Sequence, residues 1–197
     1  MEKILNISLV GVGGQGTLLA SEILCRVALL SGQDVKKSEV HGMAQRGGSV
    51  ISQVRIGPKV YSPIIAEGQT DFLVAFEKVE ALRYAHLLSA NGTALVNDQE
   101  IRPVTVSSGL SQWPEDLDSH LVQTFPKMEL FPALRMAQEL GNVRVMNVCM
   151  MGALSKFSKI EESIWLEAIK ELVPPKVINI NLLAFESGKA ACCNVVG

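Results

Sequence analysis

The chain opens with an apolar stretch that runs into a cluster of glycines and then into a helical pattern. Ile4–Val10 is a short apolar run typical of a buried strand, and Gly11–Gly16 (GVGGQG) follows it directly. Apolar residues then recur at helical spacing through Thr17–Leu30, and Gly32 is a plausible helix stop. A strand, a tight loop and a helix in this order predict an α/β fold with the loop at the edge of the sheet.

The glycine loop has the GxGxxG spacing of a phosphate-binding turn, at Gly11, Gly13 and Gly16. Glycine allows positive φ and lets the backbone approach a phosphate closely. The helix start adds N–H groups and a partial positive charge, and the Thr17 hydroxyl can cap the helix or bind the ligand. The predicted cofactor-binding residues are Gly11, Gly13, Gly14, Gln15, Gly16 and Thr17. The alternative is a tight turn that only packs the helix against the strand.

The position that tests a dinucleotide site carries basic residues. A nicotinamide-binding domain has an acid about 20 residues after the loop, where it holds the ribose hydroxyls. This chain has Lys36 and Lys37 in that window, and Glu39 comes slightly late. Two lysines suit a phosphate-rich ligand, so the pattern favours coenzyme A or a phosphorylated ribose over NAD. The alternative for each lysine is simple surface solvation.

A second polar loop, Ser38–Val50 (SEVHGMAQRGGSV), sets a histidine, a glutamine and an arginine beside three glycines. Histidine suits proton transfer near pH 7, and arginine can clamp a carboxylate or phosphate with two hydrogen bonds. His41 and Arg46 are therefore the candidate catalytic residues. The predicted active-site or interface loop consists of His41, Gln45, Arg46, Gly47 and Gly48. The alternatives are an interface histidine and an interface ion pair.

Glu77 stands where a predicted strand, Phe72–Phe76, gives way to a predicted helix, Val79–Leu88. Residues at this junction usually face the ligand in α/β sheets, so Glu77 joins the candidate site. No cluster of metal-ligating residues is evident, and none is predicted.

The rest of the chain alternates strands and helices in the first half, and helices dominate the second half. Further strands are predicted at Val35–Val40, Val50–Ile56, Lys59–Ile65, Thr93–Val96 and Val104–Val106, with a turn at Asn91-Gly92 and a loop over Ser107–Ser119. Further helices are predicted at Phe131–Leu140, Val145–Phe157, Ile164–Leu172 and Val177–Ala191. These elements predict a three-layer α/β/α, Rossmann-like fold with a mainly parallel sheet. A hairpin of Val50–Ile56 with Lys59–Ile65 would make the sheet mixed.

Length and composition limit the functional classes. The 197 residues contain no linker or repeat, so residues 1–197 are predicted to form a single domain. The net charge of −2 and the lack of a basic run argue against nucleic acid, and no apolar run is long enough to span a membrane.

Hydrophobic residues make up 48% and charged residues only 19%, against about 25% in typical domains. The excess apolar surface predicts a subunit interface, with a partner or with a second copy when the chain is isolated; a compact monomer is the alternative.

The four cysteines include no CxxC pair, which argues against a disulfide framework, a zinc site or an iron–sulfur cluster in this chain. Buried free thiols in a reducing cytoplasm are the preferred interpretation. The N-terminus has no signal-peptide pattern. The expected location is therefore the cytoplasm.

Three motifs in order, GVGGQG, SEVHGMAQRGGSV and DFLVAFEKVEAL, resemble those of the 2-oxoacid:ferredoxin oxidoreductases. The chain is most similar to the small (beta) subunits of the indolepyruvate type, which correspond to the gamma domain of pyruvate ferredoxin/flavodoxin oxidoreductase. The resemblance covers essentially the whole chain. It implies oxidative decarboxylation of indolepyruvate or a related aryl 2-oxoacid to its acyl-CoA, with reduction of ferredoxin.

The resemblance also implies how cofactors are divided between subunits. A large (alpha) subunit would hold thiamine diphosphate, Mg and the iron–sulfur clusters, and ferredoxin would dock through it. No cofactor would be tightly bound to this chain, whose Gly11–Thr17 loop would contact coenzyme A and whose His41–Gly48 loop would face the shared active site or the large subunit. The alternatives are a relative specific for pyruvate or a branched-chain 2-oxoacid, a stand-alone nucleotide-binding oxidoreductase, and a regulatory ligand-binding domain.

Overall fold

The computed structural model describes residues 4–41, 48–102, 106, 109, 113 and 116–192, except for the side chain of His41. These residues form one six-stranded sheet with the strand order β2-β3-β1-β4-β5-β6. The strands are β1 (Leu5–Val12), β2 (Asp34–His41), β3 (Ser49–Gly57), β4 (Thr70–Ala75), β5 (Leu88–Asn97) and β6 (Met128–Phe131).

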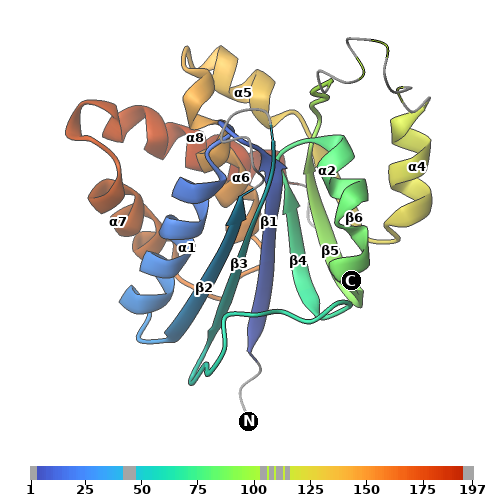
Figure 1. Cartoon of the computed structure of the whole chain (residues 1–197). Coiled ribbons are helices and arrows are strands. Elements are labelled where there is room, and N and C mark those ends of the chain that lie inside the picture. Colours follow the sequence, from blue (N-terminus) through green and yellow to red (C-terminus); the bar gives the residue numbers. More distant parts are fainter. Residues whose placement is uncertain are drawn as a thin grey trace.

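Helices cover both faces of the sheet, which makes the predicted three-layer α/β/α fold correct (Figure 1). One face carries α1 (Thr17–Leu30), α5 (Ala133–Glu139), α6 (Met146–Ser155), α7 (Glu162–Leu172) and α8 (Ile178–Ala191). The other face carries α2 (Lys78–Arg83) and α4 (Leu117–Thr124). Short 3-10 turns lie at Ala85–Leu87, Val143–Val145 and Pro175–Val177. Among the described residues, no helix is long and apolar enough to cross a membrane.

The sheet is mixed, which the sequence left open, but the predicted hairpin is not the reason. β1, β4, β5 and β6 pair in parallel, whereas β3 lies between β1 and β2 and is antiparallel to both. The predicted strand Lys59–Ile65 is wrong, because this segment is a loop. Its backbone is bonded by side chains instead: the Arg55 Nη1 donates to the carbonyls of Ser62 and Ile64, and Gln53 bonds both backbone groups of Ile65.

The larger core lies under α1 and α5–α8, and the close packing of α6 on α8 depends on two glycines. A Cβ at Gly152 would lie 2.0 Å from the Phe185 carbonyl oxygen, and one at Gly188 would lie 1.9 Å from that of Cys149. The two backbones therefore touch, and α6 is buried along its whole length. This explains why Val145–Phe157 reads as apolar without a clear polar face.

Other boundaries differ from those predicted. The helix predicted at Val79–Leu88 is a shorter α2 followed by a 3-10 turn, and β5 begins at Leu88, well before the predicted Thr93. The predicted turn at Asn91-Gly92 therefore lies inside β5, at a point where the pairing of β5 with β4 shifts register. Strand β6 and helix α4 were not predicted. The predicted strand Val104–Val106 falls largely outside the described residues.

Candidate functional site

The glycine loop joins the carboxyl end of β1 to α1, at the centre of the sheet. β1 and β4 are parallel neighbours, but the chain leaves β1 toward β2 and β3 and leaves β4 toward β5 and β6. The strand order thus reverses between β1 and β4. In open α/β sheets, ligands bind outside the carboxyl ends of the strands at such a point.

A cavity of about 410 Å3 opens beside the glycine loop. Gly14–Gly16 form one wall, Gln99 comes from the segment after β5, and Leu134 comes from α5. The remaining wall consists of Val143, Arg144, Met146 and Asn147, at the start of α6. The cavity is within the size range of small-molecule sites.

The electrostatics of this cavity suit an anion. Helices α1 and α6 both begin at its wall, and neither has an acidic residue in its first turn, so the positive ends of their dipoles are not compensated there. Arg144 lines the cavity with an exposed side chain, and no carboxylate is among the described residues that line it. A guanidinium beside two helix N-termini can bind a phosphate or carboxylate.

Gln15 supports the loop from within. Its Oε1 accepts a hydrogen bond from the backbone N–H of Val12 (2.7 Å), and its Nε2 donates to the Phe76 carbonyl (2.9 Å) and to Gln99 Oε1 (3.1 Å). Gln99 Oε1 also accepts from Asn97 Nδ2 (3.1 Å). The Gln15 amide thus connects the ends of β1, β4 and β5, and this network holds the loop in place.

Gly16 is the point at which α6 packs against the loop. Its φ of 82° lies in the left-handed region, and a Cβ there would lie 2.6 Å from Asn147 Nδ2. Asn147 Nδ2 donates to the Gly16 carbonyl over 3.2 Å. Gly14 also has a positive φ, of 105°. Thr17 does not cap α1, because it is the first helical residue and Gly16 occupies the N-cap without a side-chain bond.

The two loops singled out in the sequence meet in the structure. The Gly13 N–H donates to the Gly48 carbonyl over 2.8 Å, and Val12 of β1 pairs with Ser49 of β3. His41 is the last residue of β2 and pairs with Val50. Gln45, Arg46, Gly47 and the His41 side chain lie outside the described residues, so their predicted roles stay predictions.

Glu77 is buried, with 1% of its surface exposed, and is the N-cap of α2. Its Oε1 accepts from the Glu80 N–H, whereas its Oε2 has no hydrogen-bond partner among the described residues. Burial raises the pKa of the Glu77 carboxyl, since desolvation and the charge of Glu80 outweigh the backbone N–H groups that favour the charged form. Glu80 in turn accepts from the Ser49 hydroxyl and from Arg83 Nε (2.8 Å). Glu77 does not line the cavity.

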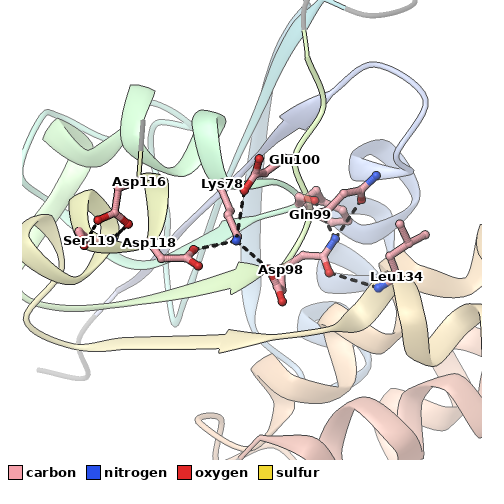
Figure 2. Close-up of polar contacts among 10 residues, drawn as sticks. Lys78, Asp98, Gln99, Glu100, Asp116, Asp118, Ser119 and Leu134 are labelled. Carbon is pink, nitrogen blue, oxygen red and sulfur yellow. Dashed lines mark hydrogen bonds and ion pairs between the residues drawn. The ribbon is translucent and has the colours of Figure 1, made fainter. Parts of the chain in front are cut away.

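Lys78 stabilises the segment that carries Gln99 (Figure 2). Its side chain is only 6% exposed, and its Nζ lies 2.8 Å from Asp98 Oδ1, 2.7 Å from Asp118 Oδ1 and 3.5 Å from Glu100 Oε1. Burial alone would lower the pKa of Lys78, but the hydrogen bonds to Asp118 and Asp98 outweigh it and raise the pKa above its ordinary value. The Lys78 N–H also donates to the Gln99 carbonyl (2.9 Å). Lys78 therefore joins α2, the end of β5 and α4.

Sequence reasoning missed Asn97, Gln99, Arg144 and Asn147. The sequence does mark the two asparagines, because each is a lone amide beside an apolar run. A polar side chain buried with such a run requires hydrogen-bond partners, so it tends to have a structural role. Asn97 Oδ1 accepts from the Leu134 N–H (3.2 Å) and so attaches α5 to β5. Arg144 gave no such signal, because it lies in a short polar segment between two predicted helices.

Comparison with known proteins gives the family. Pyruvate ferredoxin/flavodoxin oxidoreductase is the family that matches, over residues 6–191. The indolepyruvate oxidoreductase subunit IorB of Thermococcus kodakarensis is 43% identical over 99% of both chains. This chain belongs to the pyruvate ferredoxin/flavodoxin oxidoreductase family. The resemblance seen in the three motifs is thereby confirmed.

Two further proteins that match this chain are much longer than it is. The chain spans 35% of the ketoisovalerate oxidoreductase subunit VorA of Methanothermobacter marburgensis, with 29% identity over 92% of this chain. A solved 2-oxoglutarate:ferredoxin oxidoreductase from Magnetococcus marinus, with 2-oxoglutarate, coenzyme A and succinyl-CoA bound, has the same fold: the TM-score is 0.75 at 22% identity, over 98% of this chain and 31% of that chain. In both, the part that this chain matches is about a third of a longer polypeptide.

Proposed function

We propose that this chain is the small subunit of a ferredoxin-dependent 2-oxoacid oxidoreductase that acts on indolepyruvate or a related aryl 2-oxoacid. The observation that carries the proposal is the 43% identity to an IorB subunit over 99% of both chains. Membership of the family makes the chain a component of an oxidoreductase. The choice of an aryl substrate rests on the name of that relative.

In the proposed reaction, the 2-oxoacid and coenzyme A give the acyl-CoA, CO2 and one proton, and two electrons pass to two oxidised ferredoxins. The large subunit would hold thiamine diphosphate, Mg and the iron–sulfur clusters, which supply the chemistry of decarboxylation and electron transfer. The role proposed for this chain is to bind part of coenzyme A and to complete the enzyme. Its compartment would be the cytoplasm, in keeping with the free thiols of Cys25 and Cys149.

The cavity beside the glycine loop fits the phosphorylated end of coenzyme A. This ligand carries a diphosphate and a 3′-phosphate, and the cavity offers the starts of α1 and α6 together with Arg144. Leu19, Leu134 and Met146 supply an apolar wall against which a base or a pantetheine chain can pack. At about 410 Å3, the cavity would hold only part of the ligand, and the rest would lie toward the large subunit.

The proposal is tested by anaerobic co-expression with the large subunit encoded in the same genome, followed by viologen reduction against a panel of 2-oxoacids. We expect co-purification and reduction that requires both indolepyruvate and coenzyme A, whereas the chain alone should be colourless and inactive. A preference for pyruvate or a branched-chain acid would refute the aryl specificity but keep the reaction. NAD(P) bound by the lone chain, or a small ligand without any partner, would refute the proposed function.

A further inference from the structure

Among the described residues, no helix packs on one side of β2 and β3. Over β2 and β3, α1 covers one side of the sheet, whereas α2 and α4 on the other side pack over β1, β4 and β5 (Figure 1). Lys37 and Glu39 of β2 turn toward α1, where they contact Glu22 and Ser21. The alternate residues point the other way and, with their cross-strand partners, form what we name the β2–β3 face: Lys36, Ser38, Val40, Ile51, Gln53 and Arg55.

Apolar side chains are exposed to solvent at both ends of the β2–β3 face. Val40 is 61% exposed at one end, next to its cross-strand partner Ile51. At the other end lies the loop that follows β3, with Tyr61 at 87% and Ile64 at 59% exposure. An edge strand such as β2 is usually protected from unwanted pairing by charges. An exposed valine beside an isoleucine therefore suggests that this end is covered in the complete enzyme.

The loop that carries Tyr61 and Ile64 is held in place before any partner binds. Arg55 Nη1 donates to the Ser62 and Ile64 carbonyls (2.9 and 3.2 Å), and the Val60 N–H donates to Asp34 Oδ2 (2.9 Å). Val60 and Ile65 are buried on either side of the exposed pair. A rigid loop loses little conformational entropy on binding, and exposed tyrosine is a typical interface residue.

We infer that the β2–β3 face and the Tyr61–Ile64 loop form the docking surface for the large subunit. This inference rests on the proposed function. In VorA and in the Magnetococcus chain, the part that this chain matches is joined to about twice its own length of polypeptide, which supplies a large neighbour for such a surface. The face also ends beside the candidate site, because Ser49 pairs with Val12 and Gly48 accepts from Gly13. A partner on this face thus reaches the glycine loop.

The surface composition indicates what the partner presents. Asp34 lies on the same side of β2 as Lys36 and pairs with its Nζ (2.9 Å), and Arg55 donates to the Ser62 and Ile64 carbonyls, so both cations of the face already have partners within the chain. The matching surface of the large subunit is therefore apolar opposite Val40 and Tyr61.

The test compares Val40→Asp and Ile64→Asp with a matched control, Val122→Asp, on α4 at the opposite end of the molecule. Val122 is 66% exposed, close to the exposure of Val40. Each variant is titrated against the purified large subunit by calorimetry, and melting temperatures verify that the variants fold. A buried, unpaired carboxylate costs at least about 2 kcal/mol, so the dissociation constant should rise on the order of 30-fold or more for Val40→Asp and Ile64→Asp. Val122→Asp should bind like wild type.

The outcomes separate this inference from the proposed function. If the wild-type chain fails to bind the large subunit, the proposed function and the inference are both refuted. If the wild-type chain and all three variants bind the large subunit equally, only the inference is refuted. It also falls if light scattering shows an isolated wild-type dimer that Val40→Asp dissociates without weakening the large subunit's binding. Should Val40→Asp disturb the edge strand, Ile64→Asp in the loop still decides the question.

Discussion

The side chains of Gln15 and Gln99, 84 residues apart in the chain, hydrogen-bond to each other over 3.1 Å. Through this contact the glycine loop after β1 depends on the segment after β5. Lys78 stabilises that segment from the other side, because its backbone N–H donates to the Gln99 carbonyl and its Nζ pairs with Asp98. The shape of the candidate site is therefore set by three strand ends and not by the GxGxxG pattern alone.

Gln99→Leu should weaken ligand binding through this contact. The substitution removes the acceptor of Gln15 Nε2 and Asn97 Nδ2, although both amides keep the Phe76 carbonyl as a second acceptor. We expect a loss of about 1–2 kcal/mol in the free energy of unfolding and roughly tenfold weaker binding of coenzyme A by calorimetry. Gln123→Leu, on the exposed side of α4, is the control and should change neither value. Unchanged affinity in Gln99→Leu would mean that the contact does not shape the site.

Gly16→Ala should destabilise the chain more than Gly32→Ala. Both glycines have positive φ, which costs an L-residue about 1–2 kcal/mol. A Cβ at Gly32 meets open space, whereas one at Gly16 would lie 2.6 Å from Asn147 Nδ2 and push α6 away. Denaturant unfolding should show the difference, and Gly16→Ala alone should lose affinity for coenzyme A. Equal losses of stability would show that α6 can move away from Gly16 at little cost in free energy.

Glu77→Gln should alter the pH dependence of stability. Because the folded-state pKa of Glu77 is raised, the folded chain holds its proton more tightly than the unfolded chain does. Stability is therefore lost as pH rises from the unfolded value, about 4.3, to the folded one. Glutamine keeps an acceptor for the Glu80 N–H but carries no charge. The melting temperature of Glu77→Gln, relative to wild type, should be higher at pH 7 than at pH 4.

The control for this titration is Glu186→Gln, at an exposed position on α8. Its melting temperature should stay close to that of wild type at both values of pH. If Glu77→Gln also parallels wild type at pH 4 and pH 7, the buried carboxyl does not titrate differently in the folded and unfolded chains. Glu77 would then act only as a helix cap.

The parts of the fold that were predictable are those encoded locally. β1, the glycine loop and α1 follow one another without interruption, so the apolar run and the glycine spacing suffice to place them. The pairing of β3 between β1 and β2 is not local, and two nearby strand-like segments wrongly suggested a hairpin. Pro63 in the second segment could have argued against it, since proline cannot donate to a strand ladder.

The candidate site was predictable on one side only. The glycine loop marks its near wall, but the far wall comes from the start of α6, about 130 residues later. No spacing rule connects Gly16 to Asn147 or Gln15 to Gln99. β6 was missed because its four residues, MELF, are too few for a periodic pattern, and α4 because Leu117–Thr124 is largely polar.

The most direct measurement is the KM for coenzyme A of the reconstituted two-subunit enzyme with Arg144→Ala. A charged hydrogen bond to a phosphate is worth about 1.5–3 kcal/mol, so this KM should rise on the order of tenfold or more, with kcat and the KM for the 2-oxoacid unchanged. Arg135→Ala, on the exposed side of α5, is the control and should match wild type. Arg144→Ala with a wild-type KM for coenzyme A would contradict the assignment of the cavity beside the glycine loop to this ligand.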